Sequence, residues 1–146
     1  MKRGKVLIID SEEVVCKALS IILEDTGYET TTSLRGEEGL RLVKENIYDI
    51  AILNLNIPDM NGIALLKNLK EIDPNLVVIV ITEQPFLRTE HEGLPYEVFD
   101  YIAKPFHSRD IQEVIEKAIN YANMLRDGQK ICDDLEKHIK EVGDEE

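Results

Sequence analysis

The chain alternates short apolar runs with segments of helical periodicity, and this alternation constrains its fold most strongly. Val6 to Ile9, Ile50 to Leu53 and Leu76 to Ile81 are nearly continuous apolar runs, as in strands covered on both faces. Two further strands are predicted over Glu29 to Thr32 and Val98 to Ala103. The pattern predicts an α/β fold with a doubly wound, five-stranded parallel sheet flanked by helices.

The segments between the strands carry helix signals. Apolar residues repeat at helical spacing from Glu12 to Asp25, and Gly27 is expected to end that helix. Ser33 is predicted to cap the next helix. A third helix is predicted from Ile63 to Leu69, and a long helical pattern begins near Ser108.

Composition and charge restrict the function. The 146 residues suffice for one domain with an appended element, and the formal net charge is −12. Such a chain is repelled by phosphate backbones and anionic membranes, so we expect no nucleic-acid or membrane binding by this chain. Cys16 and Cys132 form no metal-binding motif and are typical of a reducing compartment. No segment has the roughly 20 apolar residues of a membrane span, so a cytoplasmic protein is expected.

Polar residues follow four of the predicted strands, and in parallel sheets such positions form sites. They are Asp10 and Ser11, Asn54, Thr82 and Glu83, and Lys104 and Pro105. Asn54 stands at the end of a buried strand and opens a polar loop that contains Pro58 and Gly62. We therefore expect a functional site at this edge of the sheet.

These motifs, in this order, resemble the receiver domains of bacterial response regulators over roughly residues 4 to 124. The resemblance implies a flavodoxin-like fold and a phospho-switch with two acids after the first strand and an acceptor Asp after the third. A Thr or Ser, an aromatic switch residue and a Lys-Pro pair complete the family's site. The matching positions are Asp10 and Ser11, Asn54, Thr82, Tyr101, and Lys104 with Pro105.

The sequence departs from that pattern at three positions. Asn54 is a neutral amide and cannot form an acyl phosphate. Ser11 replaces one acid, so the acidic pocket is Asp10, Ser11 and Glu12, and Mg²⁺ is expected to bind weakly, through Asp10 and Asn56. Glu83 follows Thr82 where the family has a small residue, and its charge would oppose a phosphoryl group.

Lys104 admits two interpretations. Its Lys-Pro pair either only closes the last turn between strand and helix, or its ammonium pairs internally with Asp10 or Glu83, because a buried cation needs a partner. In the second case Glu83 would act as a built-in anion.

Tyr101 is either a half-buried strand tyrosine or a switch. The segment from Glu83 to Tyr96 is irregular and is assigned to the output surface, whereas the three histidines are expected on the surface: His91, His107 and His138.

Beyond the expected receiver-like domain, residues 1–126, the apolar residues continue into a C-terminal extension, residues 127–146. They follow an a/d heptad pattern with Gly128 at one d position. Either the last helix runs on to about Val142, or it bends at Asp127 and Gly128, where glycine costs about 1 kcal/mol. The extension would fold back on the domain, or serve as a linker or as a coiled coil that makes a homodimer.

The sequence thus predicts a receiver-like signalling and protein-interaction module, not an enzyme, that is not phosphorylated and requires no cofactor. Expected partners are a histidine kinase, an output domain or another signalling protein. One alternative is a conventional phospho-switch in which Asn54 was introduced by engineering. Another is a haloacid-dehalogenase-like phosphatase, which would require a second Asp where Glu12 stands. A flavin protein would require an uncharged phosphate loop after the first strand.

Overall fold

The computed structural model describes residues 2–83 and 98–144, with side chains up to residue 140. The strands are β1 (Lys5–Ile9), β2 (Glu29–Ser33), β3 (Ile50–Asn54), β4 (Val77–Thr82) and β5 (Asp100–Ala103). The helices are α1 (Glu13–Asp25), α2 (Gly36–Glu45), α3 (Gly62–Ile72) and α5 (Ser108–Asp144). No helix in these ranges is long and apolar enough to cross a membrane. The predicted irregular segment after Glu83, with His91, lies outside the described residues.

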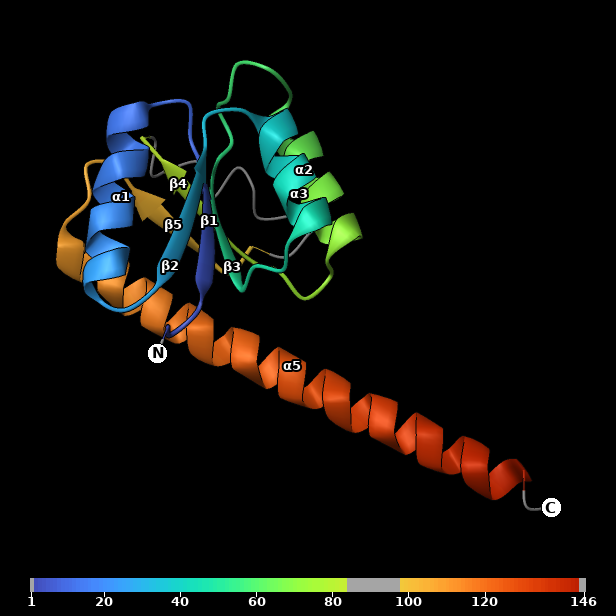
Figure 1. Ribbon diagram of the computed structural model, residues 1–146. Coiled ribbons are helices and arrows are strands. Elements are labelled where there is room, and N and C mark those ends of the chain that lie inside the picture. Colours follow the sequence, from blue (N-terminus) through green and yellow to red (C-terminus); the bar gives the residue numbers. More distant parts are fainter. Residues whose placement is uncertain (1, 84–97, 145–146) are drawn as a thin grey trace.

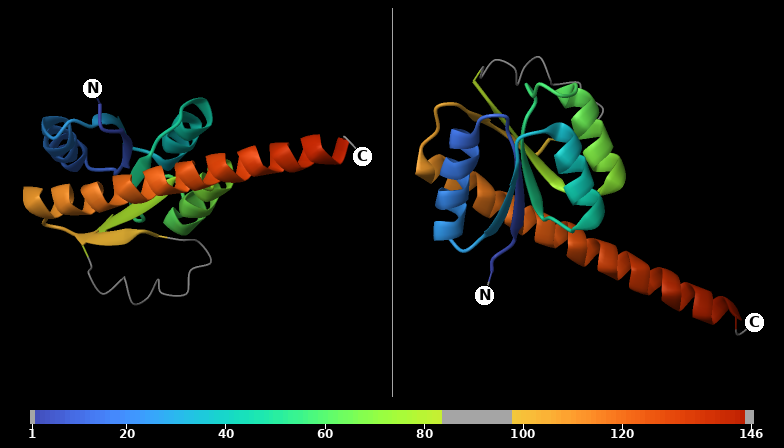
Figure 2. Two further views of the ribbon diagram at one scale, coloured as in Figure 1. Left: turned by 90° about the horizontal axis from the view of Figure 1, so that it is seen from below. Right: turned by 45° about the horizontal axis from the view of Figure 1, so that its top comes forward.

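The strands form one parallel sheet in the order β2-β1-β3-β4-β5, with helices on both faces (Figure 1). Helices α1 and α5 cover one face, and α2 and α3 cover the other (Figure 2). The predicted doubly wound sheet is therefore confirmed. The three continuous apolar runs became β1, β3 and β4, the inner strands, because only inner strands are buried on both faces.

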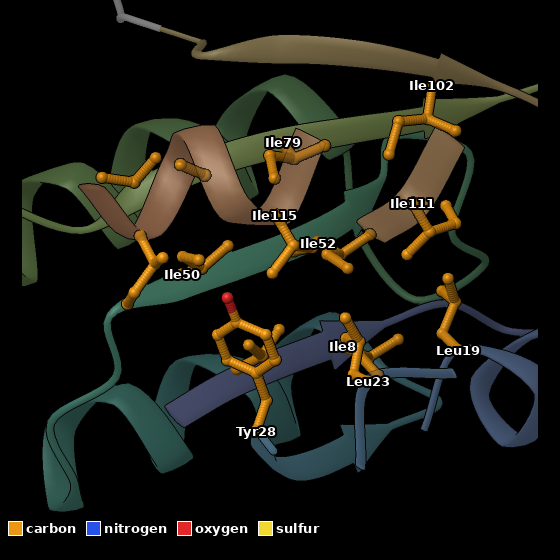
Figure 3. Close-up of a cluster of buried hydrophobic side chains, with 14 of the residues drawn as sticks. Ile8, Leu19, Leu23, Tyr28, Ile50, Ile52, Ile79, Ile102, Ile111 and Ile115 are labelled. Atoms are coloured by element: carbon orange, nitrogen blue, oxygen red, sulfur yellow. The ribbon is translucent and has the colours of Figure 1, made fainter. Parts of the chain in front are cut away.

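The core lies in two layers, one on each side of the sheet. Side chains of β1, β3 and β4 alternate between the layers. Ile8 and Ile52 lie in the layer under α1 and α5 (Figure 3), whereas Leu7 and Leu53 lie in the layer under α2 and α3. Gly27, after α1, has a φ of 97°, which glycine adopts without strain and which confirms the predicted helix end. The sheet is thus a rigid platform whose carboxyl edge can hold a site.

The long last helix is continuous. Helix α5 runs from Ser108 to Asp144 without interruption at Gly128, so the predicted alternative of a bend at Asp127 and Gly128 is wrong. Up to residue 140, Ala122 is the last buried residue of the helix, and the part that follows it projects from the domain (Figure 1). An extension that folds back on the domain is likewise ruled out for this part of the chain.

Tyr28 gives a stability prediction. Its side chain is 2% exposed, and its hydroxyl makes no hydrogen bond to the described residues, while burial raises the pKa of the phenol. An unsatisfied buried hydroxyl is unfavourable, so Tyr28→Phe is expected to increase the free energy of unfolding by about 1 kcal/mol. Urea denaturation checks this value. A destabilised Tyr28→Phe protein would show instead that a buried water satisfies the hydroxyl.

Candidate functional site

The carboxyl ends of four strands meet at one edge of the sheet. Asp10 follows β1, Asn54 ends β3, Thr82 ends β4, and Lys104 follows β5. Pairing of Asn54 with Ile81, and of Thr82 with Ala103, aligns these strand ends. The predicted convergence of these polar residues is therefore confirmed.

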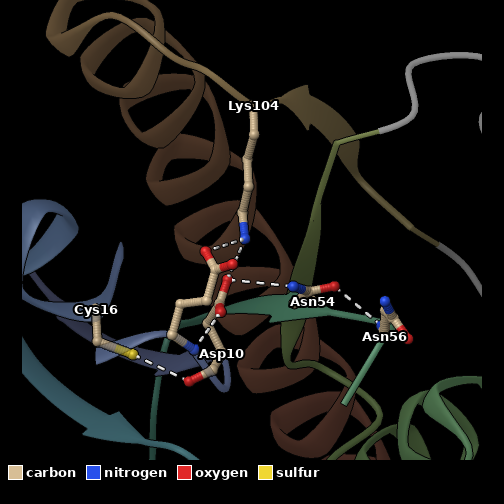
Figure 4. Close-up of polar contacts among 6 residues, drawn as sticks. Asp10, Cys16, Asn54, Asn56 and Lys104 are labelled. Atoms are coloured by element: carbon tan, nitrogen blue, oxygen red, sulfur yellow. Dashed lines mark hydrogen bonds and ion pairs between the residues drawn. The ribbon is translucent and has the colours of Figure 1, made fainter. Parts of the chain in front are cut away.

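Asp10 is the centre of the site and is completely buried. Its Oδ1 accepts the backbone N–H of Glu12 at 2.8 Å. Its Oδ2 accepts the Lys104 ammonium at 2.8 Å and the Asn54 side-chain amide at 3.3 Å (Figure 4). Both carboxylate oxygens are therefore engaged within the protein.

Lys104 pairs with Asp10 although 94 positions separate the two residues in the sequence. Its side chain is 8% exposed, and its ammonium lies 2.8 Å from Asp10 and 3.5 Å from Glu12. Its backbone N–H donates to the Thr82 carbonyl at 2.7 Å, which fixes the start of the loop after β5. The predicted ion pair with Asp10 is confirmed. Glu83 is exposed, and within the described residues Glu12 is the second carboxylate that meets Lys104.

Asn54 shows why an amide suits this position. It donates from Nδ2 to Asp10, and its Oδ1 accepts the backbone N–H of Asn56 at 2.9 Å. A carboxylate at position 54 would place a second negative charge beside Asp10 Oδ2. Two carboxylates at such a short distance repel one another. The amide instead supplies the donor that Asp10 requires. An amide lacks the nucleophilic oxygen needed to bond to phosphorus.

The donor set fits a divalent metal poorly. Asp10 is the only buried carboxylate at the site among the described residues, and both of its oxygens are used. Ser11 and Asn56, the neighbouring oxygen donors, are exposed. Mg²⁺ is bound through carboxylate ligands, and here it would compete with the Lys104 ammonium for the Asp10 carboxylate.

Three other predicted residues, Thr82, Tyr101 and Pro105, lie near this edge. Thr82 is buried at the end of β4, and Tyr101 is half-buried on the neighbouring β5. Pro105 is exposed and follows Lys104 through a cis peptide bond. His107 and His138 are exposed, as predicted.

Asp59 was missed by the sequence analysis. It lies in the loop between β3 and α3, yet its carboxylate accepts the backbone N–H groups of Gly36 at 2.9 Å and Glu37 at 3.1 Å. These hydrogen bonds lower the pKa of Asp59. The predicted cap, Ser33, bonds instead to the backbone of Arg35. The loop that follows Asn54 is therefore tied to the start of α2.

Cys16 borders the site from α1 and gives a second prediction. Its Sγ donates to the Asp10 carbonyl at 3.4 Å, and burial, together with the Asp10 charge, raises the pKa of the thiol from 9.0 to about 11. Only the thiolate is reactive, so at pH 8 iodoacetamide should modify the exposed Cys132 and leave Cys16 unmodified. Intact mass should show one adduct in the native protein and two in urea. Two adducts without urea would contradict the buried position of Cys16.

Comparisons with known proteins agree with this geometry. A sequence profile described as "Response regulator receiver domain" matches residues 6–116. The chain is 31% identical over 121 residues to the transcriptional regulatory protein ZraR of Salmonella typhimurium, covering 82% of this chain and 27% of that protein. It is 30% identical over 119 residues to the uncharacterized transcriptional regulatory protein YkoG of Bacillus subtilis, covering 82% and 52% respectively.

Solved structures show the same fold. A receiver domain protein from Clostridium thermocellum has a TM-score of 0.75 and 31% identity, covering 84% of this chain and 98% of that one. A receiver domain protein from Methanospirillum hungatei has a TM-score of 0.77 and 26% identity, covering 83% and 97%. This chain spans about a quarter of ZraR and about half of YkoG, since it covers 27% and 52% of their lengths. The profile match, the relatives and the fold together show that the chain belongs to the response regulator receiver domain family.

Proposed function

We propose that this receiver domain is a signalling and protein-interaction module that works without aspartyl phosphorylation. The observation that carries the proposal is the contact between the Asn54 amide and the Asp10 carboxylate, at 3.3 Å. It puts a neutral, non-nucleophilic group where the family has its acceptor Asp. Ser11 removes a second acid of the family's site, which further weakens any dependence on Mg²⁺.

The position of Lys104 supports the same proposal. In a phosphorylatable site an ammonium and a hydroxyl hold the phosphoryl oxygens. Here the ammonium donates to Asp10 at 2.8 Å and lies 3.5 Å from Glu12, so the protein's own carboxylates compensate its charge. The domain thus has a fixed, internally neutralised site. Glu12 occupies the place of the second Asp of haloacid-dehalogenase-like phosphatases, and its contact with Lys104 disfavours that activity.

The partners proposed are proteins: a histidine kinase, an output domain or another signalling protein. Two relatives are named transcriptional regulators, and this chain covers only part of each. With a net charge of −12, this chain itself is unsuited to DNA, so any DNA contact would belong to an attached domain. We further propose that residues 1–126 form the receiver unit, that residues 127–146 form its helical extension, and that the protein acts in the cytoplasm.

An NMR titration tests the proposal on the whole chain. Amide signals of residues 10, 11, 54 and 56 are followed while Mg²⁺ and then beryllofluoride, a mimic of the phosphoryl group, are added. Beryllofluoride requires a carboxylate and a metal, so no saturable shift is expected below about 10 mM Mg²⁺. The double variant Ser11→Asp/Asn54→Asp is the matched control and should respond. A saturable response of the unmodified chain would favour the alternative, a conventional phospho-switch.

A further inference from the structure

A groove lies beside the site, between helix α1 and the turn that joins β5 to α5. Its volume is about 570 Å³, a size typical of small-molecule sites, which span roughly 300–1,000 Å³. Helix α1 contributes Val14, Val15 and Ala18 to its lining, and the turn contributes Pro105 and Phe106. Val14 is 81% exposed and none of these five side chains is fully buried, so this apolar wall is open to water.

Three charged residues also line the groove, and their environment makes it acidic. They are Glu12, Glu83 and Lys104. The Lys104 ammonium lies 2.8 Å from Asp10, so these two charges compensate one another (Figure 4). The Glu12 side chain is 54% exposed and Glu83 is exposed as well, so both carboxylates are accessible to a ligand. The groove therefore combines an apolar wall with the negative charge of two acids.

An anionic ligand does not suit this groove. Its charge would approach Glu12 and Glu83, and it would compete with Asp10 for the Lys104 ammonium. Release of Lys104 would leave Asp10, which is completely buried, without its cation, and an unpaired buried charge is strongly unfavourable. A cation instead meets charges of opposite sign and leaves the ion pair between Lys104 and Asp10 intact.

We propose that the groove is a binding site for a small organic amine in its protonated form. The ammonium donates to the carboxylates of Glu12 and Glu83, and the hydrocarbon part covers the apolar wall. Burial of the hydrocarbon supplies affinity, whereas the two acids select for positive charge. The consequence for signalling rests on the proposed function: in a domain that works without phosphorylation, an amine bound beside Lys104 supplies a chemical signal at the same edge of the sheet.

An NMR titration of the full chain with three probes of equal chain length tests the proposal. Hexylamine, hexan-1-ol and hexanoate are a cation, a neutral molecule and an anion at pH 7, and the amide signals of residues 12, 15, 18, 83 and 106 are followed. Hexylamine should give saturable shifts with a dissociation constant below about 10 mM, which a ligand of this size can reach. Hexan-1-ol should bind at least about fivefold more weakly, the factor for one ion pair at about 4 Å in water.

Two further probes set the limits of the site. Hexanoate should give no saturable shift, because it has the wrong charge. Methylamine has the charge without the hydrocarbon, so it should not saturate the groove below about 10 mM. Equal affinity for hexylamine and hexan-1-ol, or no saturable response to hexylamine, would overturn the proposal.

Three variants separate the acids from the apolar wall. Glu83→Gln should weaken hexylamine about fivefold and leave hexan-1-ol unchanged, whereas Val14→Ser should weaken both. Glu45→Gln is the matched control, because it removes the same charge at the exposed end of α2, on the other face of the sheet, and should change neither. All three positions are exposed, so thermal unfolding should show the variants folded.

An equal loss of hexylamine binding in Glu83→Gln and Glu45→Gln would show only a general attraction to this acidic chain, and would overturn the proposal. Asn54 lies outside the lining of the groove. These results are therefore independent of whether position 54 accepts phosphate, so that failure of the amine site and failure of the proposed function can be distinguished.

Discussion

Replacement of Lys104 by methionine is expected to lower the free energy of unfolding by about 3 kcal/mol, the effect of removing one partner from a buried ion pair. The variant leaves Asp10, which is completely buried, without its cation. The amide of Asn54 and the backbone N–H of Glu12 still bind the carboxylate, so the effect should lie at the lower end of the known range. Methionine preserves the length of the side chain, so that little packing is lost.

Urea denaturation of three further variants isolates this interaction. Asp10→Asn/Lys104→Met should lose clearly less than the sum of the two single variants, because the double variant leaves no charge unpaired. Lys117→Met is the matched control on the exposed side of α5 and should change stability by less than about 0.5 kcal/mol. If Lys104→Met matches Lys117→Met, the ion pair does not stabilise this site.

Gly62→Ala should destabilise the protein by about 2–3 kcal/mol, as overpacking of a closed site does. Helix propensity alone predicts the opposite sign, since Gly62 is the first residue of α3. A Cβ at this position would lie 2.0 Å from the carbonyl oxygen and 2.5 Å from the Cα of Leu55. These are backbone atoms, so the loop that follows Asn54 would have to move.

Gly128→Ala is the control for this prediction. Nothing lies within 4 Å of a Cβ added at Gly128, in the middle of α5, so alanine there should stabilise the helix by up to about 1 kcal/mol. Thermal unfolding of the two variants should therefore give shifts of opposite sign. A stabilised Gly62→Ala protein would contradict the close approach of α3 to Leu55.

The strands and the composition of the site were predictable because they depend on local pattern. The apolar runs around Ile8, Ile52 and Ile79 are buried strands, and parallel strands bring the residues that follow them to one edge. The contact between Lys104 and Glu12 was not predictable, because the two residues are 92 positions apart in the sequence and their contact depends on how both side chains are oriented. The same holds for Asp59, which caps a helix 23 residues before it and leaves no local signal.

The predicted bend at Gly128 was wrong for a related reason. Propensity gives only the cost of glycine in a helix, whereas the hydrogen bond from Gln129 to Asp133, four residues apart, and the ion pair between Arg126 and Asp49 favour a continuous α5. Asp49 lies 77 positions before Arg126 in the sequence, so this ion pair became visible only in the structure. The backbone elements could be predicted from the sequence pattern, whereas the side-chain contacts between residues distant in the sequence could not.

Intact mass after incubation with Mg²⁺ and a small-molecule phosphodonor tests the central claim most directly. The unmodified chain should keep its mass, because Asn54 has no nucleophilic oxygen and Asp10 is held by Lys104. The Ser11→Asp/Asn54→Asp variant, treated identically, should gain about 80 Da, the mass of one phosphoryl group, since it regains the anionic oxygens that the metal and the acyl phosphate need. A phosphoryl adduct on the unmodified chain would contradict the proposal that this domain works without phosphorylation, and would show that it is a conventional phospho-switch.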